Sequence, residues 1–97
     1  MFTGIIESTG TITKIEKEGT NIHFTVKASI TSELKIDQSL AHDGVCLTVV
    51  AIDGDEYVVT AIEETLVRSA IGDRKVGDEL NLERAMISNG RLDGHIV

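Results

Sequence analysis

The sequence has little cysteine, little aromatic character and no proline: one Cys, three aromatic residues and no Pro among 97 residues. A single cysteine excludes an internal disulfide, so the fold must rest on its core. Without proline, low-complexity segments or a shift in composition, nothing marks a linker, and the length suits one domain, residues 1–97. No charged and then apolar leader and no apolar run near the roughly 18 residues of a membrane span are present, which predicts a cytoplasmic protein, neither exported nor membrane-bound.

Basic residues are also scarce, since nine Lys and Arg stand against sixteen Asp and Glu, for a net charge of −7. Nucleic acids are bound by basic stripes, so this balance argues against a nucleic-acid partner. Glycine-rich phosphate loops are absent as well. Because only Phe2, Phe24 and Tyr57 are aromatic, aliphatic side chains must fill the core. They either pack tightly or leave space for the ring of a ligand.

What the sequence does have is alternation of apolar and polar residues. In NIHFTVKA, residues 21–28, Ile22, Phe24 and Val26 share one face with Ala28, which is typical of a half-buried strand. Similar segments are TGTITKIE (9–16), SLAH (39–42), VCLTVVAI (45–52), EYVVTAI (56–62) and ELNLER (79–84), with turn sequences KEGTN (17–21), HDG (42–44) and DGD (53–55) between some of them. Six short strands of this kind predict an antiparallel barrel or sandwich.

Two stretches break the alternation. SITSELK at 29–35 predicts a helical turn capped by Ser29 or Thr31. EETLVRSAIG at 63–72 predicts a short helix, since acidic residues occupy its first turn, Glu64 and Arg68 are i,i+4 partners, and Gly72 sits at a C-terminal position.

The segment VCLTVVAI also holds a candidate site. Cys46 and Thr48 share a face with Val50 and Ile52, while Val45, Leu47, Val49 and Ala51 form the other face. A strand that is apolar on both faces is usually buried on both, in a closed barrel or at a subunit contact. Cysteine alone is often only a small buried hydrophobe. A buried threonine hydroxyl needs a partner, because leaving it unpaired costs roughly 1–3 kcal/mol, and a polar ligand could be that partner.

Two other stretches are candidates. TAIEET at 60–65 ends a strand and begins the helix, so it presents side-chain oxygens and backbone N–H groups at one rim, for a ligand or for ordinary capping. In MFTGII, Gly4 allows a close approach by another backbone or a ring, or is simply a flexible glycine in an early strand.

Two kinds of site are disfavoured. A nucleophile formed from His42, Asp43 and Cys46 lacks the geometry, because neighbours across one turn cannot easily align a base with a nucleophile. A metal site formed from His23, His42, Cys46 and His95 lacks paired-ligand spacing.

Five stretches together resemble riboflavin synthase, in its N-terminal half: MFTGIIE (1–7), AHDGVCLTV (41–49), EETL (63–66), VGDELNLERA (76–85) and DGHIV (93–97). The resemblance implies an all-β fold, a six-stranded antiparallel Greek-key barrel with one or two short helices. It also implies a parent enzyme with two such barrels per chain, assembled as a homotrimer. That family converts two molecules of 6,7-dimethyl-8-ribityllumazine into riboflavin and 5-amino-6-ribitylamino-pyrimidinedione without a cofactor, at sites formed between barrels of different subunits.

The resemblance also implies roles for individual residues. The residues implied to bind the substrate are Gly4, Ile5, Ile6, Cys46, Leu47, Thr48, Thr60, Ala61, Ile62, Glu63, Glu64 and Thr65. Phe2 and Thr3 fall where the family completes its site, and Cys46 and His95 are the candidate catalytic groups. His95 matches the first histidine of the family stretch GGHxxxGH, with Asp93 in place of a glycine. The second histidine of that stretch lies beyond this sequence.

For this chain, the expectation is a single barrel that binds lumazine or riboflavin, turns over little or not at all, and forms a two-fold homodimer. One alternative is a non-enzymatic carrier of lumazine with the same fold. Another is a small oligonucleotide- or sugar-binding barrel, which the acidic charge and the scarcity of aromatic residues disfavour.

Overall fold

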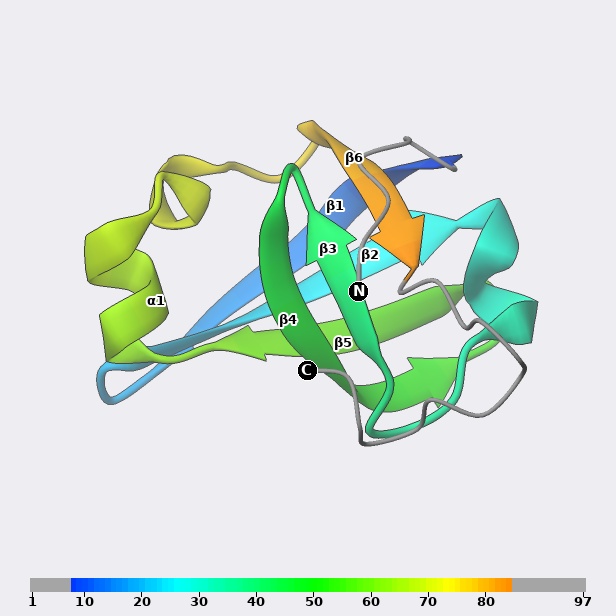
Figure 1. Ribbon diagram of the computed structural model, residues 1–97, viewed down its shortest axis with the longest axis horizontal. Helices are drawn as coiled ribbons and strands as arrows, with labels where there is room; N and C mark the ends of the chain where they lie inside the picture. Colours follow the sequence, from blue (N-terminus) through cyan, green and yellow to red (C-terminus); the bar gives the residue numbers. More distant parts are fainter. Residues whose placement is uncertain (1–7, 85–97) are drawn as a thin grey trace.

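The computed structural model describes residues 8–84, which form a closed barrel of six strands (Figure 1). The strands are β1 (Ser8–Glu18), β2 (Asn21–Ala28), β3 (Ser39–His42), β4 (Val45–Asp53), β5 (Glu56–Ala61) and β6 (Glu79–Arg84). Neighbouring strands are antiparallel, and their order around the barrel is β1-β2-β5-β4-β3-β6, with β6 pairing back to β1. Of the two predicted architectures, the barrel is therefore confirmed.

Tight hairpins occur where turn sequences were predicted, at residues 19–20, 43–44 and 54–55. The turn between β3 and β4 shows why an Asp-Gly pair is used. Asp43 and Gly44 have φ angles of 51° and 87°. Two successive positive φ angles give a turn whose twist matches that of the strands, and glycine adopts them without a steric cost.

The barrel interior is filled by apolar side chains. Phe24 and Tyr57 both point inward, and aliphatic residues fill the rest of the space. The side chains that are at most 5% exposed in this core include Ile12, Phe24, Val26, Ala28, Leu40, Leu47, Val49, Tyr57, Val59, Ala61, Leu80 and Leu82. Gly10 allows β1 to approach this core closely, because a Cβ atom there would lie 2.5 Å from Cγ1 of Val26. Within residues 8–84, the barrel interior is thus occupied by aromatic and aliphatic side chains of the chain itself.

Two β-bulges change which residues face inward. In β1 the register shifts between Ile12 and Lys14, which lets both Ile12 and Ile15 pack on the core despite their odd spacing. In β4 it shifts between Val49 and Ala51.

The bulge in β4 corrects the predicted faces of this strand. Ile52 packs against the core together with Leu47, whereas Ala51 is exposed. Within the barrel of this chain β4 is buried on one face only, because Cys46 and Thr48 are exposed and Val50 is 47% exposed. Burial of the other face at a subunit contact stays a prediction. The barrel has one core, so only the inward face of each strand is covered by it.

The helical segments lie at opposite ends of the barrel (Figure 1). The turn η1 (Ser29–Glu33) was predicted, but neither Ser29 nor Thr31 caps it, since the N-cap residue is Ala28. The hydroxyl of Thr31 instead lies 2.8 Å from the carbonyl oxygen of Ala28 and 2.9 Å from that of Asp55, and so fastens η1 to the turn between β4 and β5.

The predicted helix at 63–72 is shorter than expected. Helix α1 (Glu63–Arg68) is followed by a separate turn, η2 (Ile71–Asp73), so Gly72 does not end the helix. The hydroxyl of Ser69 donates to the carbonyl oxygen of Thr65 at 2.7 Å and caps the last turn in its place. No helix within residues 8–84 has the length and apolar character needed to cross a membrane.

Candidate functional site

A row of polar side chains crosses the outer face of four strands. Thr48 of β4 pairs with Ser39 of β3 on one side and with Thr60 of β5 on the other, and Thr60 pairs in turn with His23 of β2. Residues paired in this way lie on the same face of a sheet. The neighbours of these residues along the strands, such as Val59 and Leu47, point into the core. The row Ser39–Thr48–Thr60–His23 therefore presents three hydroxyl groups and an imidazole outward, and we call it the polar row.

Cys46 and Thr48 are brought together on this outer face, as the sequence predicted. Cys46 is exposed and free of any disulfide, and Thr48 is exposed two residues further along β4. The sequence argument assumed that the hydroxyl of Thr48 is buried and therefore needs a ligand as its hydrogen-bond partner. In the structure this hydroxyl is exposed instead, so a ligand can reach it from the outer face.

Leu47 and Ala61 hold different positions from the other candidate residues of β4 and β5. Their side chains lie in the barrel core, 4% and 0% exposed. Strand alternation requires this, since each is flanked by residues that face outward. Only their backbone atoms can face a ligand on the outer surface, so Leu47 and Ala61 can take part in the predicted site through their backbone atoms alone.

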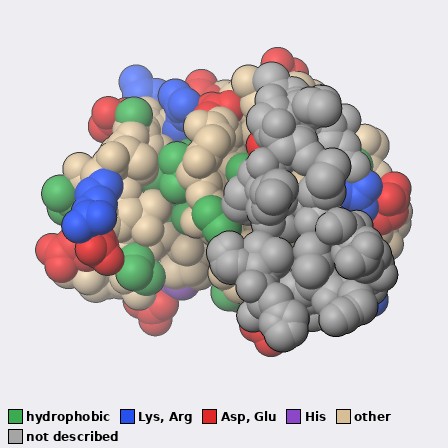
Figure 2. All heavy atoms as spheres, in the orientation of Figure 1, with side chains coloured by type: hydrophobic (Ala, Val, Ile, Leu, Met, Phe, Trp, Pro, Cys, Tyr) green, Lys and Arg blue, Asp and Glu red, His purple; other side chains and the backbone are tan. Residues whose placement is uncertain are grey.

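The polar row is next to the corner where β5 ends and α1 begins. Ile62 at this corner is 51% exposed, Glu63 and Glu64 are exposed, and Thr65 is partly buried. Ile62 is also the N-cap residue of α1 and provides no side-chain cap. Glu64 forms the predicted ion pair with Arg68, at 3.2 Å, and Figure 2 shows acidic and basic side chains side by side over this end of the molecule. The corner thus carries both charged and apolar groups.

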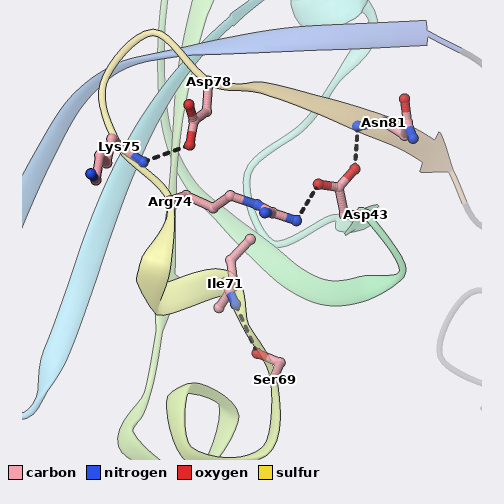
Figure 3. Close-up of polar contacts among 7 residues, drawn as sticks. All are labelled: Asp43, Ser69, Ile71, Arg74, Lys75, Asp78 and Asn81. Atoms are coloured by element: carbon pink, nitrogen blue, oxygen red, sulfur yellow. Dashed lines mark hydrogen bonds and ion pairs between the residues drawn. The ribbon is translucent and has the colours of Figure 1, made fainter.

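The segment that follows α1 is fastened to the barrel by Asp43 (Figure 3). One oxygen of its carboxylate accepts a hydrogen bond from Nη2 of Arg74 at 2.7 Å, and the other accepts from the backbone N–H of Asn81 at 2.7 Å. The backbone N–H of Lys75 donates to Asp78 at 2.9 Å and tightens the turn before β6. These contacts set the position of the connection from α1 to β6 relative to the turn between β3 and β4.

His23 was missed as a functional residue by the sequence reasoning, which considered it only as a metal ligand. Its Nδ1 lies 2.8 Å from Oγ1 of Thr60, and its Nε2 lies 2.7 Å from Oε1 of Glu18. His23 is half-buried beside the hydroxyl groups of the polar row. Ser39 was missed as well. The polar face of NIHFTVKA is visible in the sequence, but its pairing with β5 is not.

His42 lies inside the barrel and not at the outer site. Its Nδ1 donates to the carbonyl oxygen of Leu40 at 2.9 Å, and its Nε2 lies 2.8 Å from the hydroxyl of Tyr57. Burial lowers the pKa of His42 from 6.5 to about 4, and burial also raises the pKa of Tyr57. Because His42 points inward and Cys46 outward, the turn separates the members of the disfavoured nucleophile. Within residues 8–84, no cluster of three or more potential metal ligands occurs.

Several candidate residues lie outside the described residues 8–84. These are Phe2, Thr3, Gly4, Ile5, Ile6 and His95. A shallow depression within the described part, with a volume of about 480 Å³, is lined by residues of β1, the end of β2 and Asp55. Since Lys27 pairs with Glu56 there, this depression lies at the opposite ends of β2 and β5 from His23 and Thr60.

The fold and this outer face define a small closed antiparallel β-barrel domain, and the comparisons with known proteins give its family. The family model described as the lumazine binding domain matches residues 3–85. The chain therefore belongs to the lumazine-binding domain family. This confirms the family resemblance that the sequence motifs indicated.

Individual relatives agree with this assignment. The chain is 42% identical over its whole length to the riboflavin synthase of Bacillus amyloliquefaciens, and 41% identical to that of Actinobacillus pleuropneumoniae. The matches cover 46% of each relative and lie in its N-terminal half, so the chain spans about half the length of the curated relatives it matches.

Solved structures show the same fold. The crystal structure of LumP complexed with 6,7-dimethyl-8-(1'-D-ribityl) lumazine aligns with a TM-score of 0.80 at 27% identity, over 99% of this chain and 57% of that one. The structure of LumP complexed with riboflavin aligns with a TM-score of 0.81 at 27% identity, over 100% of this chain and 56% of that one.

Proposed function

We propose that this chain is the N-terminal barrel of a riboflavin synthase, and that it binds one ribityl-lumazine or riboflavin on the outer face of β4 and β5. The observation that carries the proposal is the polar row, which a member of the lumazine-binding family presents beside the corner at residues 60–65. A flat heterocycle has apolar faces and polar edges, and its sugar-alcohol tail has hydroxyl groups to pair. Exposed apolar groups next to hydroxyls suit both parts of such a ligand.

Each group has a proposed contact. Cys46 and Thr48 meet the edge of the ring through their side chains, and Leu47 does so through its backbone. Thr60 also meets the edge of the ring, while Glu64 and Thr65 pair with hydroxyl groups of the ribityl chain. The remaining members of the proposed ligand-binding set are Gly4, Ile5, Ile6, Ala61, Ile62 and Glu63, with Phe2 and Thr3 completing the site.

The parent enzyme, in this proposal, has two Greek-key barrels per chain and forms a homotrimer. It dismutates two 6,7-dimethyl-8-ribityllumazine molecules to riboflavin and 5-amino-6-ribitylamino-pyrimidinedione. Transfer between two bound molecules needs both to be held face to face, so positioning dominates the catalysis and no cofactor is required. Cys46 and His95 are the proposed groups for proton transfer. A single barrel holds one ligand, so the isolated chain is expected to show little or no turnover.

A two-fold homodimer is proposed for the isolated chain. Ile36, Val50 and Ile62 are each about half exposed, at 52%, 47% and 51%, and a second copy could cover such residues. Sedimentation at tens of micromolar should show the dimer, and a purely monomeric chain would contradict it. We place the protein in the cytoplasm, because its exposed free Cys46 suits a reducing compartment.

The experiment that tests the binding site is a titration of riboflavin followed by fluorescence polarisation. Thr48→Val removes one hydroxyl from the polar row, and the loss of one hydrogen bond is expected to weaken binding about threefold to tenfold. The matched control is Thr9→Val, because Thr9 is also exposed but lines the depression beside β1. Binding that weakens in Thr9→Val and not in Thr48→Val would place the ligand in that depression and refute the proposed site.

A second candidate function is a non-enzymatic carrier of lumazine. It is favoured by the solved LumP structures that share this fold. A full-length parent carrying both barrels separates the two candidates. Formation of riboflavin from 6,7-dimethyl-8-ribityllumazine identifies the enzyme, whereas binding without any product identifies the carrier.

A further inference from the structure

Three side chains from different strands form a hydrogen-bonded chain that ends in the polar row. The carboxylate of Glu18, at the end of β1, lies 2.7 Å from Nε2 of His23 in β2. Nδ1 of the same ring lies 2.8 Å from the hydroxyl of Thr60 in β5. The side chain of Glu18 is 76% exposed and that of His23 is 26% exposed, so the chain leads from solvent to the outer face of the barrel.

The chemistry of the three groups fixes the direction of the hydrogen bonds. A carboxylate can only accept, so Nε2 of His23 must carry the hydrogen. In the neutral ring Nδ1 is then an acceptor, and the hydroxyl of Thr60 must donate to it. The oxygen of Thr60 is left to accept a hydrogen bond from a ligand on the outer face.

A second proton on the ring reverses this arrangement. In the cation both ring nitrogens are donors, so Nδ1 donates to the oxygen of Thr60. The hydroxyl hydrogen of Thr60 is then released and can point to a ligand. When the ring of His23 is neutral, Thr60 thus accepts a hydrogen bond from an N–H or O–H group of the ligand. When the ring is charged, Thr60 donates a hydrogen bond to a carbonyl oxygen of the ligand.

We propose that His23 is a positioning residue that sets whether Thr60 accepts or donates a hydrogen bond at the outer face, and so which edge of a flat heterocycle the site recognises. Thr60 lies opposite Thr48, so the reversal occurs inside the polar row. This inference rests on the proposed function, since it concerns the same ligand on the same face. It adds a residue, His23, and a dependence of ligand recognition on the charge of the imidazole.

Within residues 8–84, the charged groups that lie in register with His23 on the neighbouring strands are those of β1. On β1, Glu16 lies directly opposite it in register, and Lys14 and Glu18 lie on the same face. Lys14 forms an ion pair with Glu16 at 3.5 Å, while Glu18 contacts the ring itself. On β5, residues 58–60 carry no titratable side chain. The charge of the ring is therefore coupled most directly to Glu18.

The first test needs no ligand. Long-range proton–nitrogen NMR spectra of the ¹⁵N-labelled protein report which ring nitrogen of His23 carries the hydrogen in the neutral form. We expect the hydrogen on Nε2, and a change in the Nδ1 resonance in Thr60→Val, which removes its partner. A neutral ring with its hydrogen on Nδ1 in the wild-type protein would overturn the inference.

The second test uses riboflavin as the probe, titrated by fluorescence polarisation from pH 5.5 to pH 8. The wild-type dissociation constant should change with pH by about threefold to tenfold, the value of one hydrogen bond gained or lost. His23→Asn keeps a hydrogen-bonding atom in the position of Nδ1 but cannot become charged, so its dissociation constant should not follow pH. Thr60→Val should lose the pH dependence too. Glu79→Gln is the control, because it removes a charge from an exposed position on β6 and should keep the wild-type profile.

The outcomes separate the inference from the proposed function. If riboflavin shows no saturable binding to the wild-type protein, the proposed function fails, and the inference about recognition fails with it. If riboflavin binds but His23→Asn keeps the wild-type pH profile, the inference alone is overturned. A flat wild-type profile also overturns the inference and leaves the proposed function standing.

Discussion

Acid is expected to weaken the barrel through one histidine that has no contact with water. His42 is 0% exposed, and both of its ring nitrogens are already used inside the core. Nδ1 donates to the carbonyl oxygen of Leu40, so Nε2 of the neutral ring accepts from the hydroxyl of Tyr57. Protonation would place a charge in the core. It would also turn Nε2 into a donor, so Nε2 could no longer accept the hydrogen bond from the hydroxyl of Tyr57. The low pKa of His42, about 4, is caused by this burial.

The size and sign of the effect follow from the difference in pKa between the two states. An unfolded chain binds a proton to this ring near pH 6.5, whereas the folded barrel resists it until about pH 4. Between these values the unfolded state holds more protons, so the free energy of unfolding falls as the pH falls. The loss is about 1.4 kcal/mol per pH unit and about 3 kcal/mol in total. That is a large part of the roughly 5–15 kcal/mol that stabilises a typical domain.

Urea unfolding at several pH values between 4.5 and 7.5 measures this effect. Carboxyl groups also titrate in the lower part of this range, so wild type is compared with His42→Gln, which should lack the slope due to the imidazole. A direct measurement in the wild-type protein is the NMR titration of the His42 ring, which should stay neutral down to about pH 5. If the ring becomes charged near pH 6.5 while the barrel remains folded, or if His42→Gln keeps the full slope, the reasoning is refuted.

Two further substitutions test the packing and the polar contacts around the barrel. In urea unfolding, Gly10→Ala should destabilise the barrel by about 1–3 kcal/mol, because the new Cβ would lie 2.5 Å from Cγ1 of Val26 in a filled core. An unchanged urea midpoint would mean that β1 shifts to make room for the Cβ. Asp43→Asn should cost about 1–2 kcal/mol, because the charge that holds Arg74 is lost while the side-chain shape and the tolerance of positive φ are kept; no loss would mean that the pair is fully screened by solvent.

Much of the fold could be predicted from local sequence alone. The strands at 21–28, 39–42 and 79–84 have the predicted bounds, because alternation and turn residues both act over a few neighbouring positions. The bulges in β1 and β4 could not be predicted in this way. In β4, the residues after Val50 face the opposite side from the one predicted, because the bulge places one extra residue in β4 opposite β5. Such an adjustment depends on a partner strand and not on the sequence of the strand itself.

The candidate site divides in the same way. Once the turn at residues 43–44 is recognised, counting outward from it pairs Ser39 with Thr48, so this part of the polar row could have been found. The pairing of His23 with Thr60 joins β2 to β5 across more than thirty residues of sequence, and no local pattern indicates it. The end of α1 was misjudged for a related reason. A hydroxyl, that of Ser69, satisfies the last turn of the helix where a glycine was expected.

A filled core has a consequence for how tightly one barrel can bind a flat ligand. With Phe24 and Tyr57 already inside, a ring bound at the polar row lies on the outer surface, where the described barrel can cover only one of its two faces. Complete burial of a ring of aromatic side-chain size removes roughly 150–250 Å² from water, a gross gain of about 4–6 kcal/mol. Half of that is about 2–3 kcal/mol, which is less than the roughly 4 kcal/mol or more that association costs. Hydrogen bonds from the polar row and a second covering surface must supply the difference, so the affinity for riboflavin should rise when a second barrel is restored to the chain.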